Sequence, residues 1–433
     1  MSGEQAARRR VAYRSQRSGQ QRPAGPWLGR EFEVEVGAVA HGGHCVARHE
    51  GRVVFVRHAL PGERVRVRVS EDGGGSYCRA DAVAVLAASP DRVEPPCPYA
   101  GPGACGGCDW QHASAGAQLE LKAAVVREAL TRLGGLSDVD VAVQPLPGGL
   151  LGWRSRVQYA ADPAGRLGFR RHRSHEVELV DHCPLGTEAV SGVDAPAAVW
   201  PGEEVVEVVT SGAGESVVLA TPRPEQPVPP RGRQRPPRKP PARRTGPAQV
   251  TEHAAGRDWR VAAGGFWQVH PHAADTLTAA VLDLLAPAPG EAAYDLYSGV
   301  GLFAGVLAEA VGVTGRVVAV EADAAAARDA AANLAAYPGA SVHHGNVATW
   351  LDRGPGEVDL VVLDPPRSGA GLPVIAAICG LEPRAIAYVA CDPAALARDV
   401  RAAGEHGYRL TGLRAYDLFP MTQHVECVAL LER

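Results

Sequence analysis

"DLYSGVGLF", at residues 295–303, runs from the end of a predicted β-strand through a glycine-containing loop into a helix. Gly299 and Gly301 carry no Cβ, so the backbone there can turn tightly and approach a bound ligand. Strand-like and helix-like segments alternate around this stretch from about residue 263 to the C-terminus. Such alternation predicts an α/β domain over residues 263–433, with a Rossmann-like, doubly wound parallel sheet.

The segment after the glycine loop predicts the class of cofactor. The next strand ends at Glu321, about twenty residues after Gly301, where an acidic side chain accepts hydrogen bonds from ribose hydroxyls. The loop lacks the third glycine of the dinucleotide fingerprint, and the chain contains no Walker-type GK[ST]. S-adenosylmethionine is therefore the best remaining adenosine-containing cofactor. Asn346 ends the third strand and either lies near the adenine or simply forms the turn after Gly345.

Asp364 marks the reacting end of the predicted sheet. It ends the fourth strand, in "LDPPRSG", at the edge where methyl donor and acceptor would meet. Methyltransferases that act on exocyclic amines usually carry an aromatic residue after the paired prolines. Arg367 stands at this position, so the sequence disfavours methylation of an exocyclic amine.

Cys391 ends the fifth strand, in "AIAYVAC". A cysteine in a buried strand often acts only as a small apolar residue. The alternative is a nucleophile: carbon 5 of uracil becomes reactive only after a thiolate adds to carbon 6, and a base must then remove the carbon 5 proton. Glu426, on the last pair of strands, could be that base. Since a free thiol titrates at roughly 8.5, we expect local electrostatics to supply the thiolate.

The N-terminal half predicts two further domains. Residues 1–27 form a basic tail, expected to be disordered, and residues 28–88 read as four or five short strands of a small β-barrel of the oligonucleotide-binding kind. Residues 89–262 predict a mixed α+β domain that contains a cysteine cluster. Within it, residues 222–249 are rich in proline and arginine, which predicts a disordered insertion.

Four of the nine cysteines have a recognisable spacing: Cys97, Cys105, Cys108 and Cys183. Four thiolates can hold either zinc or an iron–sulfur cluster, and the spacing alone fits both. The N-terminus lacks the apolar stretch of a secretion signal, and no apolar run reaches the ~20 residues that span a bilayer. We therefore expect a cytoplasmic protein without a disulfide framework and without membrane contact.

The composition leaves the partner open. The formal net charge is −4, but arginines cluster in the tail and again between residues 223 and 244. Such clusters either contact phosphates or are merely solvated. No obligate protein partner is evident from the sequence.

Taken in order, the motifs resemble those of the RNA 5-methyluridine methyltransferases, which act on transfer and ribosomal RNA. The resemblance extends from about residue 28 to the C-terminus. It rests on "VVFVRHALPGERVRVRV", which is similar to a TRAM domain, and on "CPYAGPGACGGCDWQH", "GGFWQVHP", "DLYSGVGLF", "LDPPRSG", "ACDP" and "FPMTQHVE".

The resemblance implies a role for each site residue. Cys391 would be the nucleophile and Glu426 the base, while Gln268, Tyr297, Glu321, Asn346 and Asp364 match positions around cofactor and uracil. It also favours a [4Fe–4S] cluster over zinc at the four cysteines. The implied function is transfer of a methyl group from S-adenosylmethionine to carbon 5 of a uridine in structured RNA (23S rRNA or tRNA). The alternatives are an RNA-binding protein with a degenerate methyltransferase domain and a small-molecule methyltransferase.

Overall fold

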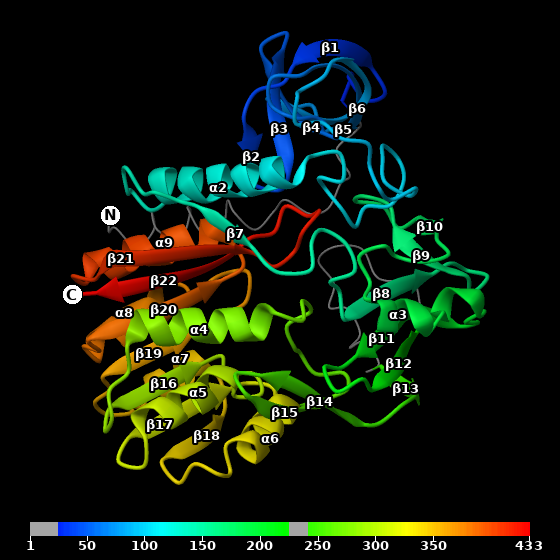
Figure 1. Ribbon diagram of the computed structural model, residues 1–433. Helices are drawn as coiled ribbons and strands as arrows, with labels where there is room; N and C mark the ends of the chain where they lie inside the picture. Colours follow the sequence, from blue (N-terminus) through cyan, green and yellow to red (C-terminus); the bar gives the residue numbers. More distant parts are fainter. Residues whose placement is uncertain (1–24, 225–240) are drawn as a thin grey trace, which may run out of the picture.

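The computed structural model describes residues 25–224 and 241–433 (Figure 1). It has a barrel at the N-terminal end, drawn in blue, a green central sheet, and a larger sheet in yellow to red. The predicted disordered tail up to residue 24, and residues 225–240 of the predicted insertion, lie outside the described residues.

The C-terminal part confirms the predicted α/β fold class. Its strands are β16 (Ala292–Leu296), β17 (Arg316–Glu321), β18 (Ala340–His344), β19 (Leu360–Leu363), β20 (Ala385–Ala390), β21 (Arg409–Asp417) and β22 (Glu426–Glu432). β18, β17, β16, β19 and β20 lie side by side in this order and run parallel. β22 is antiparallel to β20, and β21 is antiparallel to β22. The carboxyl ends of the parallel strands therefore share one edge.

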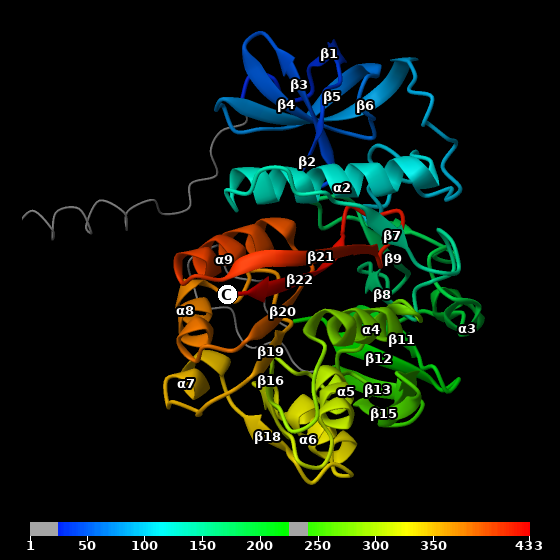
Figure 2. The ribbon, with the colours of Figure 1, turned by 60° about the vertical axis from the view of Figure 1, so that its left-hand side comes forward.

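Helices cover both faces of this sheet (Figure 2). They are α4 (Ala273–Leu285), α5 (Leu302–Val311), α6 (Ala324–Asn333), α7 (Val347–Leu351), α8 (Leu372–Gly380) and α9 (Pro393–Glu405). α4 and α5 pack in one apolar cluster, and α7, α8 and α9 pack in another. The strands between them are almost entirely buried, as expected of a parallel sheet covered on both faces.

Two elements from the predicted central domain belong to this packing instead. α2 (Ala115–Arg132) lies over α9, and β7 (Val143–Pro145) adds a parallel strand beside β21 at the edge of the sheet. Figures 1 and 2 both show α2 between the barrel and the large sheet. The assignment of all of residues 89–262 to the central domain is therefore wrong for this stretch. The sequence pattern is local and does not indicate which sheet a short strand will join.

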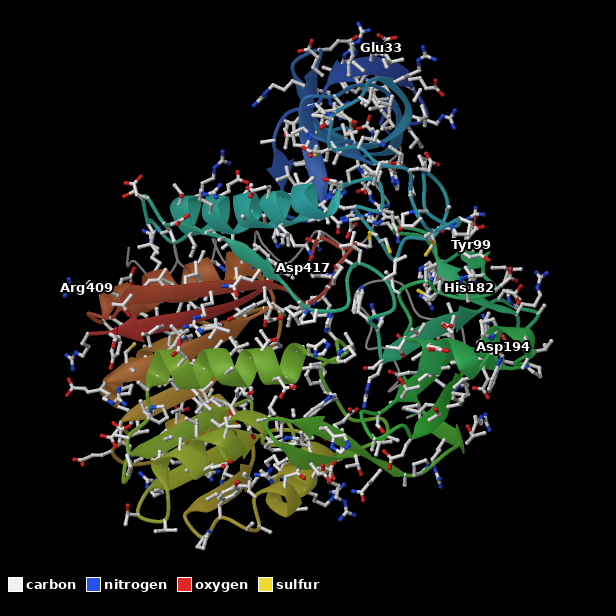
Figure 3. The ribbon with its side chains drawn as sticks, in the orientation of Figure 1. Glu33, Tyr99, His182, Asp194, Arg409 and Asp417 are labelled. Atoms are coloured by element: carbon white, nitrogen blue, oxygen red, sulfur yellow. The ribbon has the colours of Figure 1, made fainter. Side chains whose placement is uncertain are left out.

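A buried ion pair ties α2 to the large sheet. The Lys122 ammonium donates to Asp417 at 2.5 Å and to the Phe419 carbonyl at 3.1 Å, and both charged side chains are almost fully buried. Figure 3 shows Asp417 beneath α2. Removing one partner would leave the other charge buried without compensation.

We therefore expect Lys122→Met to lower the free energy of unfolding by about 3–5 kcal/mol, as measured by urea denaturation. Combining it with Asp417→Leu should restore much of the loss, because no charge then stays buried. Glu120→Gln, an exposed change on the same helix, is the control and should stay within about 0.5 kcal/mol. A similarly small effect of Lys122→Met would show that the pair does not hold α2.

The N-terminal barrel has more strands than predicted. Its six strands are β1 (Glu31–Glu35), β2 (Val39–Ala40), β3 (His44–His49), β4 (Arg52–Arg57), β5 (Arg64–Asp72) and β6 (Tyr77–Ala87), in the order β1-β5-β6-β4-β3-β2. The tail ends earlier than residue 27. Trp27 is in the barrel core, and its backbone N–H donates to the Asp72 carboxylate at 3.0 Å. Burial of this indole ring orders the segment.

The central sheet also has six strands: β10 (Val177–Leu179), β9 (Leu167–Arg170), β8 (Arg156–Ala161), β11 (Glu203–Thr210), β12 (Ser216–Pro222) and β13 (Ala242–Thr245), in this order. The prediction of a disordered insertion over residues 222–249 is thus wrong at both ends of this range. Pro222 closes β12, and β13 pairs with β12 while Arg244 forms an ion pair with Glu203. Pairing with an existing strand overrides the unfavourable local composition.

The remaining elements connect the central and C-terminal parts. α3 (Glu188–Gly192) and a 3₁₀ turn (Ala195–Ala197) lie beside the central sheet, and β14 (Gln249–Ala254) and β15 (Arg257–Ala262) form a hairpin against α6. Among the described helices, none is both long and apolar enough to cross a membrane.

Candidate active site

The glycine loop connects β16 to α5 in a strained conformation. Tyr297, Gly299 and Gly301 all have positive φ angles, of 65°, 53° and 86°. Glycine adopts such angles readily, but tyrosine does so only when its surroundings hold it there. The Tyr297 side chain packs against the apolar cluster formed by α7, α8 and α9. This packing therefore holds Tyr297 in its left-handed backbone conformation.

Glu321, at the end of β17, is fixed beside this loop. One carboxylate oxygen accepts the Gly299 N–H at 2.8 Å, and the other accepts the Asp323 N–H at 2.6 Å. Each oxygen has a further lone pair for a ligand hydroxyl. The arrangement suits a carboxylate that receives ribose hydroxyls.

Two polar groups at the same loop were missed in the sequence analysis. Asp295 is fully buried, and its Oδ2 accepts the Ala304 N–H at 2.7 Å, whereas Oδ1 and the buried Ser298 Oγ have no hydrogen-bond partner within the described part of the chain. Burial first, and then the charges of Asp364 and Glu321, raise the pKa of Asp295 to about 8. Buried polar atoms are rarely left unpaired, so these two indicate a polar ligand at the loop. The sequence signal was available, since Asp295 is the residue on which the glycine motif begins.

Gln268 and Asn346 are placed less tightly. Gln268 is half-buried in the loop between β15 and α4, where the neighbouring Trp267 packs with Val300 and Leu302 of the glycine loop. Asn346 is exposed and caps α7, because its side-chain oxygen accepts the Thr349 N–H at 3.2 Å. The turn-forming alternative for Asn346 thus has direct support.

Cys391 and Asp364 lie at the carboxyl ends of the adjacent strands β20 and β19, and Glu426 begins the neighbouring β22. Burial first, and then the charges of Glu426 and Asp364, raise the pKa of the Cys391 thiol to about 11, although Arg367 opposes them. The expectation that local electrostatics supplies the thiolate is therefore wrong for the free protein. Two carboxylates and one guanidinium surround the thiol, and the balance favours its neutral form.

The two carboxyl groups are themselves shifted. Glu426 is 4% exposed, and burial, reinforced by the charge of Asp364, raises its pKa well above the usual range of a glutamate. Burial also raises the pKa of Asp364. A carboxylate whose pKa is raised toward neutrality is a stronger base than one in water, which suits proton abstraction.

His424 is a third residue that the sequence analysis did not identify. Its Nε2 lies 3.4 Å from the Arg367 guanidinium, near the Glu426 end of β22. Burial and the nearby Arg367, Lys122 and Arg154 lower the pKa of His424 to about 4, so it is neutral at physiological pH. A neutral imidazole here can exchange hydrogen bonds with a ligand without adding charge.

The loop after the nucleophile is held by the N-terminal barrel. Asp392 caps α9 by accepting the Ala395 N–H at 2.8 Å, and its other oxygen contacts His41 Nε2 at 3.0 Å. His41 follows β2, so a barrel residue touches the neighbour of Cys391 across 351 positions of sequence. The pKa of His41 is raised by this hydrogen bond, which favours its charged form.

The loop before Glu426 is held by the cysteine segment. The Met421 carbonyl accepts the backbone N–H groups of Asp109 and Trp110, both at 3.0 Å. The Asp109 carboxylate in turn accepts the Gln423 N–H at 3.0 Å. The segment "CDW" that follows the predicted metal ligands therefore positions the strand that carries Glu426.

The four spaced cysteines converge, although they are distant in sequence. Cys97, Cys105, Cys108 and Cys183 line one pocket of about 240 Å³ in the central part, with Tyr99 and His182, which Figure 3 labels, on its wall. The Gly107 N–H donates to Cys105 Sγ at 3.4 Å. The pocket thus gathers all four predicted ligands.

Burial first, together with the other thiols of the set, raises the pKa of Cys105 to about 11 and that of Cys108 to about 12. No group of three or more His, Cys, Asp or Glu side chains within residues 25–224 and 241–433 is gathered tightly enough for a metal ion. A tetrahedral zinc with bonds of about 2.3 Å would draw its sulfurs to roughly 4 Å of one another. The thiols share a pocket but are not contracted around a single ion.

Comparisons with protein families match three parts of the chain. Residues 28–83 match the TRAM domain, and residues 354–433 match the model described as tRNA (Uracil-5-)-methyltransferase. Residues 268–351, which include the glycine loop, match protein-L-isoaspartate(D-aspartate) O-methyltransferase. The three matches follow one another along the chain in the same order as the motifs identified in the sequence.

Full-length relatives agree with this pattern. The chain is 52% identical to a Streptomyces avermitilis protein named an uncharacterized RNA methyltransferase, over 94% of this chain and 99% of the relative. It is 33% identical to the 23S rRNA (uracil(1939)-C(5))-methyltransferase of Alkalilimnicola ehrlichii, over 93% of this chain and 96% of the relative.

Among solved structures, the fold matches the tRNA (uracil-54, C5)-methyltransferase of Pyrococcus abyssi, solved in complex with S-adenosyl-L-homocysteine. The TM-score is 0.70 at 23% identity, and the match covers 92% of this chain and 100% of the other. The likeness shows a common fold over the matched part of the chain.

Proposed function

Because the chain belongs to the family of S-adenosylmethionine-dependent RNA uracil-5 methyltransferases, we propose that Cys391 and Glu426 carry out its methylation of carbon 5 of uridine. The observation that supports this assignment is the meeting of one thiol and two carboxylates at one edge of the sheet. The family assignment confirms the resemblance identified in the sequence. It also disfavours a degenerate domain or a small-molecule enzyme, as does an intact nucleophile–base pair.

In the proposed reaction, the protein's own side chains supply the nucleophile and the groups that accept protons. Cys391 loses its proton, with Asp364 as a carboxylate at the same edge that can receive it, and the thiolate bonds to carbon 6 of uracil. The electrons of the carbon 5–carbon 6 double bond move to carbon 5 and the adjoining carbonyl. S-adenosylmethionine, when bound, supplies an electrophilic methyl group for carbon 5. Glu426 then removes the carbon 5 proton, the double bond re-forms, and the carbon–sulfur bond breaks to return the thiolate.

This scheme predicts how the rate depends on pH. Since the pKa of Cys391 is about 11 in the free protein, only a small fraction of the thiol is ionised at pH 7, and this fraction grows as pH rises. The raised pKa values of Glu426 and Asp364 act in the same direction, because both must be unprotonated to accept a proton. We expect kcat/KM for unmodified RNA to increase steadily from pH 6 to 9, as measured by transfer of tritiated methyl groups. A plateau that begins near pH 6 would contradict this order of events.

The cofactor is proposed to sit on the glycine loop, held by Gly299, Gly301, Glu321 and the unpaired Asp295 and Ser298 atoms. Because charge-assisted hydrogen bonds contribute about 1.5–3 kcal/mol, Glu321→Ala should weaken binding of S-adenosylhomocysteine about 10- to 100-fold by calorimetry. Glu309→Ala, an exposed change on α5, serves as the control and should leave the affinity unchanged. Equal affinities of the wild type and Glu321→Ala would place the ribose elsewhere. The side chain of Asn346 remains a proposed contact with adenine, and Gln268 a proposed contact with the uracil.

The RNA is proposed to be 23S rRNA. The support is the full-length relative from Alkalilimnicola ehrlichii, whose name specifies a uridine of that molecule. We expect tritium from labelled S-adenosylmethionine to enter an unmodified 23S rRNA transcript and not unmodified tRNA transcripts, with mass spectrometry locating the 5-methyluridine. Label in tRNA alone would rule out 23S rRNA as the substrate but would not contradict the proposed reaction. Since ribosomal RNA lies in the cytoplasm, the proposal places the protein there too.

The four cysteines are proposed to hold a [4Fe–4S] cluster. Their common pocket and the N–H donated to Cys105 Sγ support a shared ligand for the four thiols, and the family resemblance favours a cluster over zinc. Its proposed role is structural, because the reaction moves no electron and the neighbouring segment positions the loop of Glu426. Anaerobically purified protein should be brown and contain four irons per chain, and Cys108→Ser should lose them. Colourless protein with one zinc per chain would establish the alternative metal.

A further inference from the structure

A second pocket lies where the N-terminal barrel meets the central part, outside the active site. It has a volume of about 510 Å³ and is bounded by strands β5 and β6 of the barrel, by the glycines before Cys105, and by the turn between β9 and β10. The residues of this interdomain pocket that matter below are His44, Glu71, Arg79, His172 and Arg173. Nothing in the proposed chemistry uses it.

Charged side chains dominate the wall. Four arginines (Arg57, Arg79, Arg171, Arg173) face three carboxylates (Glu71, Asp81, Glu176). The Glu71 carboxylate forms ion pairs with two of the arginines: it accepts from Arg79 at 3.2 Å and from Arg173 at 2.8 Å. All three side chains are partly exposed, so one carboxylate loosely tethers two guanidinium groups from different domains.

The arginines also act on the two histidines of the pocket. Burial first, and then the charges of Arg57, Arg79 and Arg173, lower the pKa values of both His44 and His172 to about 4. Both rings are therefore neutral at physiological pH, and their centroids lie 6.0 Å apart. An anion entering the pocket would therefore meet guanidinium groups beside two uncharged imidazole rings.

His44, one of the residues that line the pocket, also has an unsatisfied polar atom. The residue is only 7% exposed, and its ring is hydrogen-bonded to the Gly42 backbone. Its Nε2 is buried and has no hydrogen-bond partner among residues 25–224 and 241–433. With the ring neutral and its other nitrogen occupied, Nε2 is an acceptor that lacks a donor.

Aromatic rings flank the same arginine. The Phe55 and Tyr77 rings pack edge-to-face at 5.7 Å, and the Arg79 guanidinium lies over both, at 5.8 and 5.3 Å. Tyr77 is 46% exposed and, although it does not line the pocket itself, lies next to Arg79, which does. Exposed aromatic rings beside basic groups are the surface on which unpaired bases stack.

We propose that the interdomain pocket binds one unpaired nucleotide of the substrate RNA, away from the target uridine. Arg79 and Arg173 would hold its phosphate, His44 Nε2 would accept the ribose 2′-hydroxyl, and Tyr77 would stack on the base. The inference rests on the proposed function, because it takes the ligand to be the same RNA. Glu71 acts as a counter-charge that holds both guanidinium groups until the phosphate displaces it.

The pocket is mechanically connected to the active site. His44 begins β3 directly after the turn that carries His41, and His41 contacts Asp392 beside Cys391. Gly43, in the same turn, fits so closely against Gln423 that a Cβ there would lie 2.9 Å from the Gln423 Cβ. A nucleotide in the pocket would thus be held at a fixed position relative to both proposed catalytic loops.

The test measures RNA affinity of the full-length protein across salt concentrations, with the unmodified RNA of the methylation assay. Arg79→Ala and Arg173→Ala should each weaken binding about fivefold at low salt and reduce the slope of log K against log salt by about 0.7. Glu71→Gln should do the opposite and tighten binding, because it frees both guanidinium groups.

Arg66→Ala and Glu33→Gln provide matched controls. These residues form a 3.7 Å pair on the same barrel that does not line the pocket, and neither change should alter the salt slope. Weaker or unchanged binding in Glu71→Gln would overturn the proposal, because a purely structural role for Glu71 between the two domains predicts no gain in RNA affinity. Binding that follows the predicted pattern without methylation of uridine would instead contradict the proposed function alone.

Discussion

Cys391→Ala is expected to reduce methyl transfer to uridine by at least about 10⁴-fold, because removal of a covalent nucleophile leaves only binding and orientation. The affinities for RNA and for S-adenosylhomocysteine should stay within a few-fold of the wild type, since the thiol is at the strand end and contributes little to either site. The rate is measured in a single turnover with tritiated methyl donor.

Cys379→Ala provides the control for this variant. Cys379 is a buried thiol on α8 that packs in the apolar cluster and has no charged partner in the active site. Its replacement should leave the transfer rate within a few-fold. If Cys391→Ala retained comparable activity, the covalent route through this thiol would be excluded, whatever the RNA.

Glu426→Gln is expected to stop the reaction at a later point. The amide keeps the size of the side chain but cannot take the carbon 5 proton, so methylated RNA stays bonded to Cys391. Multiple-turnover activity should fall by about 10²- to 10⁴-fold, while the first methyl transfer still occurs. A covalent protein–RNA band in denaturing gels, carrying tritium, would record the trapped species.

Asp364→Asn distinguishes the roles of the two carboxyl groups. It removes the other carboxylate at the same sheet edge, and it should slow formation of the adduct without causing methylated RNA to accumulate on the protein. If the covalent protein–RNA band accumulated in Asp364→Asn and turnover were normal in Glu426→Gln, the roles of Asp364 and Glu426 would have to be exchanged. The loss of Asp364 should also lower the pKa of Glu426, because its charge is one cause of the raised value.

The sequence predicted the elements whose pattern is local. The alternation around "DLYSGVGLF" indicated a parallel sheet, and parallel strands place their carboxyl ends at one edge. This is why Cys391 and Asp364 could be expected together before their positions were known. The four cysteines were likewise recognisable by spacing.

Contacts between distant segments were not predictable in this way. The pairing of β7 with β21, the Lys122–Asp417 ion pair and the His41–Asp392 contact each join segments from different parts of the chain. Nothing in the periodicity of either segment specifies its partner. Burial and long-range charge also decide the state of the Cys391 thiol, and the sequence analysis expected the opposite sign for its pKa.

The central claim is that Cys391 bonds to carbon 6 of the target uridine. It is tested most directly with RNA that carries 5-fluorouridine, because a fluorine at carbon 5 cannot be removed as a proton and the adduct is trapped. Digestion and mass spectrometry should locate the methylated fluorouridine on the peptide that contains Cys391, and only when S-adenosylmethionine is present. An adduct on any other residue, or one that persists in Cys391→Ala, would contradict the account.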